Sequence, residues 1–378
     1  MARSRALVGV DLGDSGIRAV QLGRSGPGYE VVRAAAVDLA PGALRNGQVV
    51  DAKAVAAALR RLWRAGRFST RRAAFGLADA GVLTRQLDLP WMPPEDFRSA
   101  LRYQVEGVLP VDVGSVELDY HLLGEFESTD DRGRSMPMNR VLVVAADRRA
   151  VTDEATALRR GRVEPVAADS TALALIRAAC QGRLPADGQL HALVDLGADH
   201  LTVVIHQDSQ PRFVRTVANL GGQTATEAIA DALDLSPDRA EALKREVGLN
   251  GPPPIVTSVP ESSVFALGRA TEHVPPDPRT AVVMDVLGRW ATTITSEIRN
   301  SLDYFSASNK GEPLTDLTLT GRTFLLDGLL ERIATQLPLT VRRLDPLAGL
   351  PASRRTAKAD HAHECFAVAI GLAMADAR

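Results

Sequence analysis

Cysteine is nearly absent from this chain of 378 residues, which contains only Cys180 and Cys365. The two are far apart, and neither belongs to a C-x-x-C pair, so the sequence indicates neither a disulfide framework nor a thiolate metal site. This cysteine usage is typical of a reducing compartment. Aromatic residues make up only 4% of the chain, so we expect a core built mostly of Ala, Leu and Val.

Long apolar runs are also missing, since no stretch approaches the ~18 residues of a membrane-spanning helix. Residues 1–6 are too short for a secretion signal. Charge of one sign is missing as well: 44 basic residues face 46 acidic ones, and the net charge of −2 gives no overall attraction to nucleic acid or anionic membranes. We therefore expect a cytoplasmic globular protein of two or more domains that neither binds nucleic acid nor inserts into a membrane.

The stretch VGVDLGDSGIRAVQL, residues 8–22, contains the tetrapeptide GDSG. The same four letters surround the nucleophile of chymotrypsin-like proteases, where the histidine base and its carboxylate precede the serine in the chain. Only fourteen residues precede Ser15 here, and none is a histidine. The protease interpretation is therefore excluded, and the Gly and Asp of this turn need another explanation.

The same pattern recurs in ALVDLGADHLTVVIH, residues 192–206. Aligning the copies makes Asp11 equivalent to Asp195, Gly13 to Gly197 and Arg18 to Thr202. Each copy has an apolar run, a short polar turn and a second apolar run, which is typical of a β-hairpin. Two such hairpins predict two related α/β domains that face each other across a cleft.

A turn of this composition suits phosphate binding. Glycine lets successive backbone N–H groups point at one anion. Asp11 and Asp195, at the strand ends, are placed to hold a Mg²⁺ ion through water beside the phosphates. A plain surface hairpin is the alternative for either copy alone, and the pairing of the two copies favours the phosphate interpretation.

The remaining pattern predicts further elements. In the first half we expect strands at 29–39 and 72–77, a helix at 52–65 begun by Asp51, and a helix near 150–161. Between them, residues 82–146 read as a small insert with strands at 115–126 and 139–147, a helix that starts at Pro94, and a mobile polar connection at 127–138.

In the second half, Gly221 and Gly222 precede a helix, and a further helix places Glu241 and Lys244 on one side. A solvated ion pair of small value is the alternative role for those two residues. We expect a linker or loop at 250–263, one long amphipathic helix at 280–306, a strand–turn–helix unit with its turn at Gly321, and a closing apolar helix. A metal site in HAHEC, residues 361–365, is disfavoured because alternate positions diverge on a helix.

Together these motifs resemble the actin-like ATPase superfamily and, within it, the PilM proteins of type IV pilus assembly, which are related to the cell-division protein FtsA. The resemblance extends over nearly the whole chain. It rests on the paired hairpins and on LPWMPPEDFRSALRYQVEGVLP, ELDYHLL, AEALK, IRNSLDYF and AVAIGLA. It implies an α/β, ribonuclease H-like fold with two facing domains and an inserted subdomain. The implied boundaries are 1–81 with about 338–378 for the first subdomain, 82–165 for the insert, 166–225 with about 312–337 for the second, and 226–311 for a helical subdomain.

The resemblance also implies a site for ATP and Mg²⁺. The residues it assigns to that site are Asp11, Gly13, Ser15, Arg18, Asp195, Gly197, Thr202, Gly221, Gly222, Glu241, Lys244 and Gly321, with Ser15 a hydrogen-bond donor to phosphate. This chain departs from the family in having Arg18 for a lysine, Arg322 for a glycine, and Asp199 and His200 where Ser or Thr are common. An extra carboxylate beside phosphates is repulsive unless a metal intervenes.

The implied function is that of a cytoplasmic platform, peripheral to the inner membrane, that grips the N-terminal segment of a PilN-like membrane protein near the 89–110 block and is able to self-associate. ATP is expected to act as a conformational ligand with slow hydrolysis at most, because no residue stands out as a base. The alternatives are an FtsA-like filament protein, whose C-terminal basic amphipathic helix we do not find, and a small-molecule kinase, which would need such a base.

Overall fold

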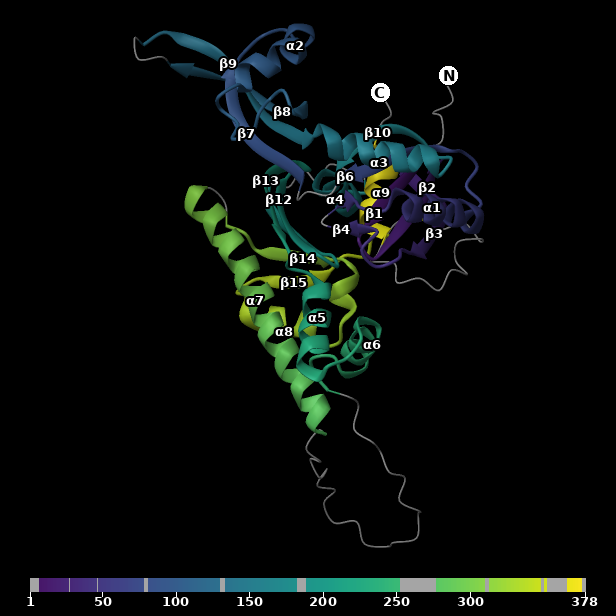
Figure 1. Ribbon diagram of the computed structural model, residues 1–378. Helices are drawn as coiled ribbons and strands as arrows, with labels where there is room; N and C mark the ends of the chain where they lie inside the picture. Colours follow the sequence, from purple (N-terminus) through teal and green to yellow (C-terminus); the bar gives the residue numbers. More distant parts are fainter. Residues whose placement is uncertain are drawn as a thin grey trace, which may run out of the picture.

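Two five-stranded sheets with the same topology form the frame of the molecule (Figure 1). The computed structural model describes residues 7–26, 28–45, 47–77, 81–129, 133–181, 188–251, 277–309, 313–347, 350–351 and 366–375. The first sheet has the order β10-β6-β1-β2-β3 and consists of β1 (Val8–Gly13), β2 (Gly16–Ser25), β3 (Gly28–Asp38), β6 (Arg72–Leu77) and β10 (Glu164–Ser170). The second has the order β13-β12-β11-β14-β15 and consists of β11 (Leu190–Leu196), β12 (His200–Gln207), β13 (Gln210–Ala218), β14 (Asp316–Thr320) and β15 (Thr340–Arg343).

The pairing directions repeat as well as the order. In each sheet the opening hairpin and the strand after it are antiparallel, and the two remaining strands add in parallel on the other side of the first strand. The sequence echo between residues 8–22 and 192–206 therefore reflects a duplicated architecture.

Helices cover both faces of the first sheet. α1 (Ala52–Gly66) and α3 (Arg148–Arg160) pack on one face, where Val8, Val10 and Ile17 are buried. Asp51 begins α1, since its carboxylate accepts hydrogen bonds from the N–H groups of Lys53 and Ala54, as the sequence predicts. The short strands β4 (Leu44–Arg45) and β5 (Gln48–Val49) precede α1.

The second sheet is covered on one face by α5 (Gly222–Leu233), the long α7 (Pro278–Ser308) and α8 (Leu329–Gln336), with α6 (Pro237–Val247) beside α5. The buried side chains of α7 recur at steps of three and four, which is why one amphipathic helix forms over nearly the predicted range. A 3₁₀ turn, η2 (Arg322–Leu325), follows β14.

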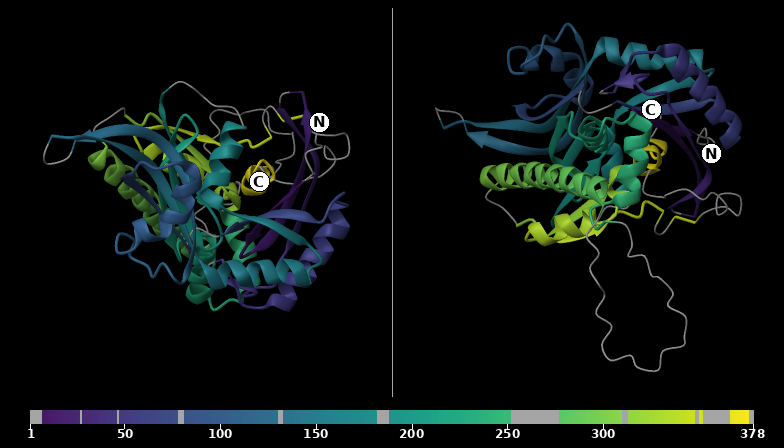
Figure 2. Two further views of the ribbon diagram at one scale, coloured as in Figure 1. Left: turned by 90° about the horizontal axis from the view of Figure 1, so that it is seen from above. Right: turned by 60° about the horizontal axis from the view of Figure 1, so that its bottom comes forward.

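Two helices lie between the sheets. α4 (Thr171–Cys180) follows the first sheet and packs on the second through β12 and β13, whereas α9 (Ala367–Ala373) lies against β1, β2 and β6 of the first. Figure 2 shows α9, in yellow, between the two halves. The two helices also pack on each other, and their apolar side chains share one core with Val20 of the first sheet and Val204 of the second.

The insert is a small unit at the upper left of Figure 1, next to the start of α3. Its sheet has the order β7-β9-β8, made of β7 (Val82–Pro90), β8 (Val116–Thr129) and β9 (Ser135–Asp147), with α2 (Pro94–Val105) packed on it around a core of its own. Most of the predicted polar connection is strand, since β8 and β9 pair as far as Thr129 and Ser135. Backbone hydrogen bonds between β8 and β9 hold these polar residues in strands. The order of their side chains does not predict this pairing.

Three boundaries differ from the sequence prediction. β10 lies in the first sheet, paired with β6, although residues 166–170 were expected in the second half. α3 packs on α1 and the first sheet, although it was expected in the insert. β15 pairs with β14 in the second sheet, although 338–378 was expected in the first half. Hydrophobic periodicity identifies a strand, but it does not show which sheet accepts it.

Within the described ranges, no helix is both long enough and apolar enough to cross a bilayer. The predicted linker at 250–263 and the HAHEC segment lie, apart from residues 250 and 251, outside the described residues.

The α4–α9 contact depends on a glycine. A Cβ on Gly371 would lie 1.8 Å from the carbonyl oxygen of Ala174, so Gly371→Ala must push the helices apart. We expect a loss of about 3 kcal/mol or more in the free energy of unfolding. Gly288→Ala is the matched control, because its Cβ on α7 meets nothing within 4 Å, and it should gain about 0.5–1 kcal/mol. Urea unfolding of both variants checks this, and equal effects would contradict it.

Candidate functional site

The two hairpin turns approach each other across a cavity between the sheets. Asp11 pairs across its hairpin with Arg18, and Asp195 pairs across its hairpin with Thr202, so the predicted equivalences hold in the strand register. The Asp14 carboxylate of the first turn lies 4.0 Å from Nδ1 of His200 in the second. The turns are therefore in near contact.

The cavity has a volume of about 830 Å³, which is within the size range of small-molecule and cofactor sites. Both halves of the chain line it: Ser15, Gly16, Arg18 and residues 36–38 from the first, and residues of α5, α6 and the turn after β14 from the second. Its charged lining residues are Arg18, Lys244, Arg245 and Arg322 against Asp38 and Glu241. Four basic residues against two acidic ones favour an anionic ligand.

The first hairpin holds its charges close together. Arg18 Nη1 lies 3.6 Å from Asp11 Oδ2 and donates to the carbonyl of Gly16 at 3.3 Å. Burial raises the pKa of Asp11, and the positive charge of Arg18 opposes this rise. A cation bound beside Asp11 would favour the ionised carboxylate in the same way.

The second hairpin turn is fixed by close backbone packing. The N–H groups of Gly222 and Gln223 donate to the carbonyls of Gly197 and Ala198 at 3.1 and 2.8 Å. A Cβ on Gly221 would lie 2.1 Å from the carbonyl oxygen of Ala198. Gly221 thus lets the start of α5 approach the turn, and Gly222 lines the cavity.

Two features of position 321 require glycine: its backbone conformation and the lack of space for a side chain. Its φ of +102° lies in the region that favours glycine. A Cβ there would be 2.7 Å from Oδ1 of Asp195. Next to it, the Thr323 hydroxyl donates to the carbonyl of Gly197 at 2.8 Å. The turn after β14 is therefore joined to the second hairpin beside the cavity.

Lys244 is a buried structural cation. Its Nζ donates to the carbonyl of Gly222 at 2.8 Å and to Thr226 Oγ1 at 2.7 Å, and it lies 2.5 Å from Oε2 of Glu241. Burial lowers the pKa of Lys244, whereas hydrogen bonds from Lys244 and Thr226 lower the pKa of Glu241 against the opposing effect of burial. The alternative of a solvated ion pair is wrong, because Lys244 is only 7% exposed.

The structure divides the predicted site residues into two groups. Those that line the cavity are Ser15, Arg18, Gly222, Glu241 and Lys244. The others, which are Asp11, Gly13, Asp195, Gly197, Thr202, Gly221 and Gly321, lie in the hairpins and turns around it. Thr202 is buried within the second sheet, 3.1 Å from the hydroxyl of Thr216. In the part of the chain that the structure describes, no cluster of three or more His, Cys, Asp or Glu residues is arranged to hold a metal ion directly.

Sequence reasoning missed several residues at the cleft. Asp38, at the end of β3, lies 3.8 Å from Arg322 Nη1, so this ion pair joins the two halves at the cavity. Thr323 and Gln223 also line it. Asp38 carries no local signal, because it comes to the site through the pairing of β3 with β2.

Glu154 is a buried carboxyl group near the first turn. It lies on α3, is 3% exposed, and its Oε2 has no hydrogen-bond partner. Burial raises its pKa well above the usual value, and the charge of Asp14 raises it further. Glu154 therefore favours the neutral acid in the folded protein.

Two facing sheets of one topology, each opened by an Asp-x-Gly hairpin that borders a shared cleft, define an actin-like fold. The predicted fold class is confirmed. The chain belongs to the family of the type IV pilus assembly protein PilM, whose model matches residues 9–252 and 275–377. The resemblance inferred from the sequence is thus confirmed, and the family match does not favour an FtsA-like filament protein or a small-molecule kinase.

Solved structures share the fold. A PilM–PilN type IV pilus biogenesis complex has a TM-score of 0.79 at 22% identity, with 100% of both chains covered. The ethanolamine utilization protein EutJ from Carboxydothermus hydrogenoformans has a TM-score of 0.53 at 15% identity, covering 97% of this chain and 88% of that one. A diol dehydratase-reactivating factor in nucleotide-free form has a TM-score of 0.50 at 11% identity, covering 97% and 99%.

Glu154 should make stability depend on pH. Because its pKa is raised in the folded state, its contribution is most favourable below the unfolded value of 4.5 and is lost as the pH rises toward the folded pKa. Glu154→Gln mimics the neutral acid, so it should raise the unfolding midpoint at pH 8 and leave it nearly unchanged at pH 4. Asp153→Asn, at the exposed neighbouring position, is the control. An equal shift of the Glu154→Gln midpoint at both pH values would contradict the prediction.

Proposed function

We propose that this chain is an ATP-binding platform protein of type IV pilus assembly that holds a peptide segment of a membrane partner. The observation that carries the nucleotide part is the cleft, where two equivalent Asp-x-Gly turns face each other beside a cavity with excess positive charge. Family membership supports the assembly role.

The chemistry of the cavity fits a nucleotide. Its volume and basic lining suit a polyphosphate ligand. Lys244, with its hydrogen bonds to Glu241 and Thr226, forms a polar wall that suits the adenosine, and Arg322 presents a planar cation beside it. Asp11 and Asp195 stand at equivalent strand positions, where they would bind Mg²⁺ through water and so offset the carboxylate of Asp14 near the phosphates.

The proposed role of the nucleotide is conformational. Residues of both halves line the cavity, so a ligand that contacts both would favour the closed arrangement. The residues at the cavity single out no general base, and we accordingly propose slow hydrolysis at most.

Nucleotide binding can be tested by calorimetry with ATP and Mg²⁺. The double change Asp11→Ala with Asp195→Ala should weaken binding by at least tenfold, the usual effect of removing outer-shell metal partners. Asp231→Ala, on the exposed side of α5, should bind as the wild type does. If the wild type binds no nucleotide, or the double variant binds equally well, the proposed site is wrong.

The partner that we propose is the N-terminal cytoplasmic segment of a PilN-like inner-membrane protein. The family match and the shared fold with a PilM–PilN complex support this choice. It would place the chain in the cytoplasm, peripheral to the inner membrane. Self-association of copies on such a platform stays a prediction.

The insert is the proposed docking surface. Leu89, Phe97 and Leu101 of the 89–110 block are buried in the core of the insert, so they cannot contact a partner. The apolar side chains of the block that stay exposed are Trp91 at 43%, Tyr103 at 76% and Val108 at 42%. Aromatic anchors of this kind dominate the free energy of peptide docking.

Docking can be measured by the fluorescence anisotropy of a labelled synthetic peptide that copies the partner's N-terminus. Trp91→Ala with Tyr103→Ala should weaken binding by at least tenfold, since each removed anchor typically costs about 1–2 kcal/mol. Tyr304→Ala, on α7 and 64% exposed, is the matched control. Equal peptide affinities of the two variants would contradict the proposal that the insert is the docking surface. A wild type that binds no peptide would contradict the proposed partner.

A further inference from the structure

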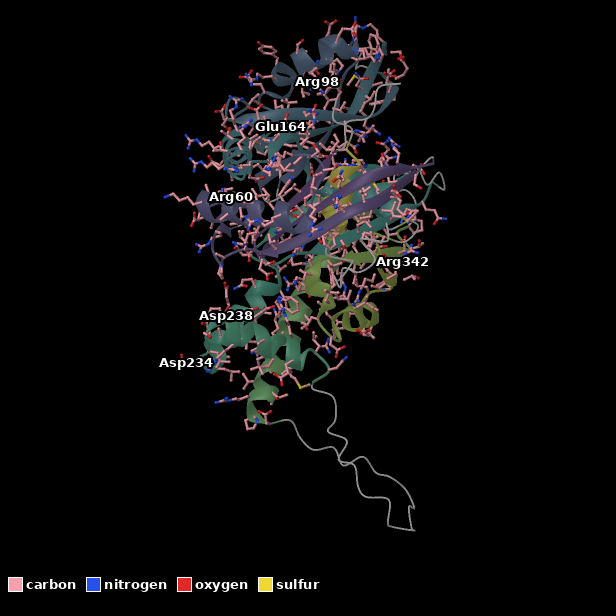
Figure 3. All side chains as sticks on the ribbon, turned by 90° about the vertical axis from the view of Figure 1, so that its right-hand side faces the viewer. Arg60, Arg98, Glu164, Asp234, Asp238 and Arg342 are labelled. Carbon is pink, nitrogen blue, oxygen red and sulfur yellow. The ribbon has the colours of Figure 1, made fainter. Side chains whose placement is uncertain are left out.

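One face of the first half carries a dense group of arginines. On α1, Lys53, Arg60 and Arg64 are exposed and share one side of the helix, because they are seven and four residues apart. Arg67 continues this row just after the helix ends. Figure 3 shows Arg60 on the outer side of α1.

A second group comes from the end of α3. Arg60 donates from Nη1 to the carbonyl of Arg160 at 2.9 Å, and Arg71 donates from Nη1 to the carbonyl of Arg162 at 2.7 Å. These contacts place the C-terminal end of α3 beside the second half of α1 and the residue before β6. We call the combined surface the arginine face, and its exposed members are Arg60, Arg64, Arg67, Arg71, Arg159, Arg160 and Arg162.

The arginine face is not neutralised by its neighbours. Glu164 adjoins it but lies 3.9 Å from Arg72. Across the described ranges, Arg64, Arg67, Arg159 and Arg160 form no ion pair. Two of the seven arginines bond to carbonyls at or just after the end of α3, but that role needs only one N–H of each guanidinium. In a chain of net charge −2, this is a local excess that averages out in the composition.

We propose that the arginine face contacts the anionic headgroups of a lipid bilayer. A bilayer attracts basic residues additively and needs no shape complementarity, which suits exposed arginines spread over α1, the end of α3 and the residues that follow each helix. A single-stranded nucleic acid would be expected to stack its bases on aromatic side chains. Trp63 is buried here, and Phe68 is packed against its ring and half-buried.

The position of the face supports the lipid assignment, and this step rests on the proposed membrane partner. The start of α3 adjoins the insert, where Arg148 bonds to Glu117 and to the carbonyl of Val116. The arginine face lies at the other end of this helix of 13 residues, about 20 Å away. A partner segment held on the insert close to its membrane anchor would bring the face near the same bilayer.

The full chain, without any partner peptide, can be tested by flotation with vesicles of phosphatidylcholine containing about one third phosphatidylglycerol. We expect binding that disappears on pure phosphatidylcholine vesicles and weakens as salt rises. Arg64→Glu, Arg159→Glu and Arg160→Glu together should weaken it by about a hundredfold, since each basic residue near such a surface contributes about fivefold. The matched control is Arg239→Glu, Arg279→Glu and Arg332→Glu, an equal change of charge at exposed positions outside the face.

Each result bears on the assignment. Equal losses in both triple variants, or wild-type binding to neutral vesicles, would overturn it. A third result would also overturn it: the wild type binds a short DNA duplex more tightly than the anionic vesicles, and the first triple variant loses this DNA binding. That result would assign the face to nucleic acid. Peptide anisotropy on the same variant separates the two proposals: retained peptide binding with lost flotation supports the lipid contact, and peptide binding that fails in the wild type overturns only the partner.

Discussion

The packing of α4 on α9 holds the two halves of the chain together. α4 continues from the first sheet and packs on the second, and α9 follows the second sheet in the chain and packs on the first. Gly371 and Ala174 bring the helix backbones close, and Arg177 donates from Nε to the carbonyl of Gly371 at 2.9 Å. A Cβ on Gly9 of β1 would lie 2.0 Å from the carbonyl oxygen of Ala369, so the first strand of the first hairpin packs closely on α9. This layer therefore sets how far apart the two hairpin turns stand.

The cleft follows from that layer. Because both sheets have the same topology and meet through α4 and α9, their opening hairpins point into one space from opposite sides. Each turn is then held by its own half: Arg18 pairs with Asp11 in the first, and the start of α5 bonds the turn of the second. Two long ion-pair contacts span the cavity, Asp14 with His200 and Arg322 with Asp38. Because the contacts across the cavity are weak and the α4–α9 packing is extensive, the structure suits a cleft whose closure responds to a ligand.

Burial gives different roles to charged residues whose sequence contexts look ordinary. Glu241 and Lys244 read as an ordinary helical pair, yet Lys244 is enclosed and hydrogen-bonded to Gly222 and Thr226. Glu154 lies in an ordinary arginine-rich helix, yet it is buried close enough to the first turn to be affected by the charge of Asp14. The arginines of α1 and α3 are unremarkable within each helix and become one surface only because the end of α3 packs beside α1. No local pattern could reveal these environments, because each is created by a segment distant in the chain.

The sequence by itself determined the local elements and the duplication. The hairpin register, the start of α1 at Asp51, the start of α2 at Pro94 and the long amphipathic α7 all follow from side-chain periodicity, capping residues and glycine, which act within a few residues. Only the tertiary structure decided that β10 joins the first sheet and β15 the second, and that Asp38 reaches the cleft. Sheet membership depends on backbone hydrogen bonds between distant segments, and those bonds leave no trace in the order of side chains along either strand.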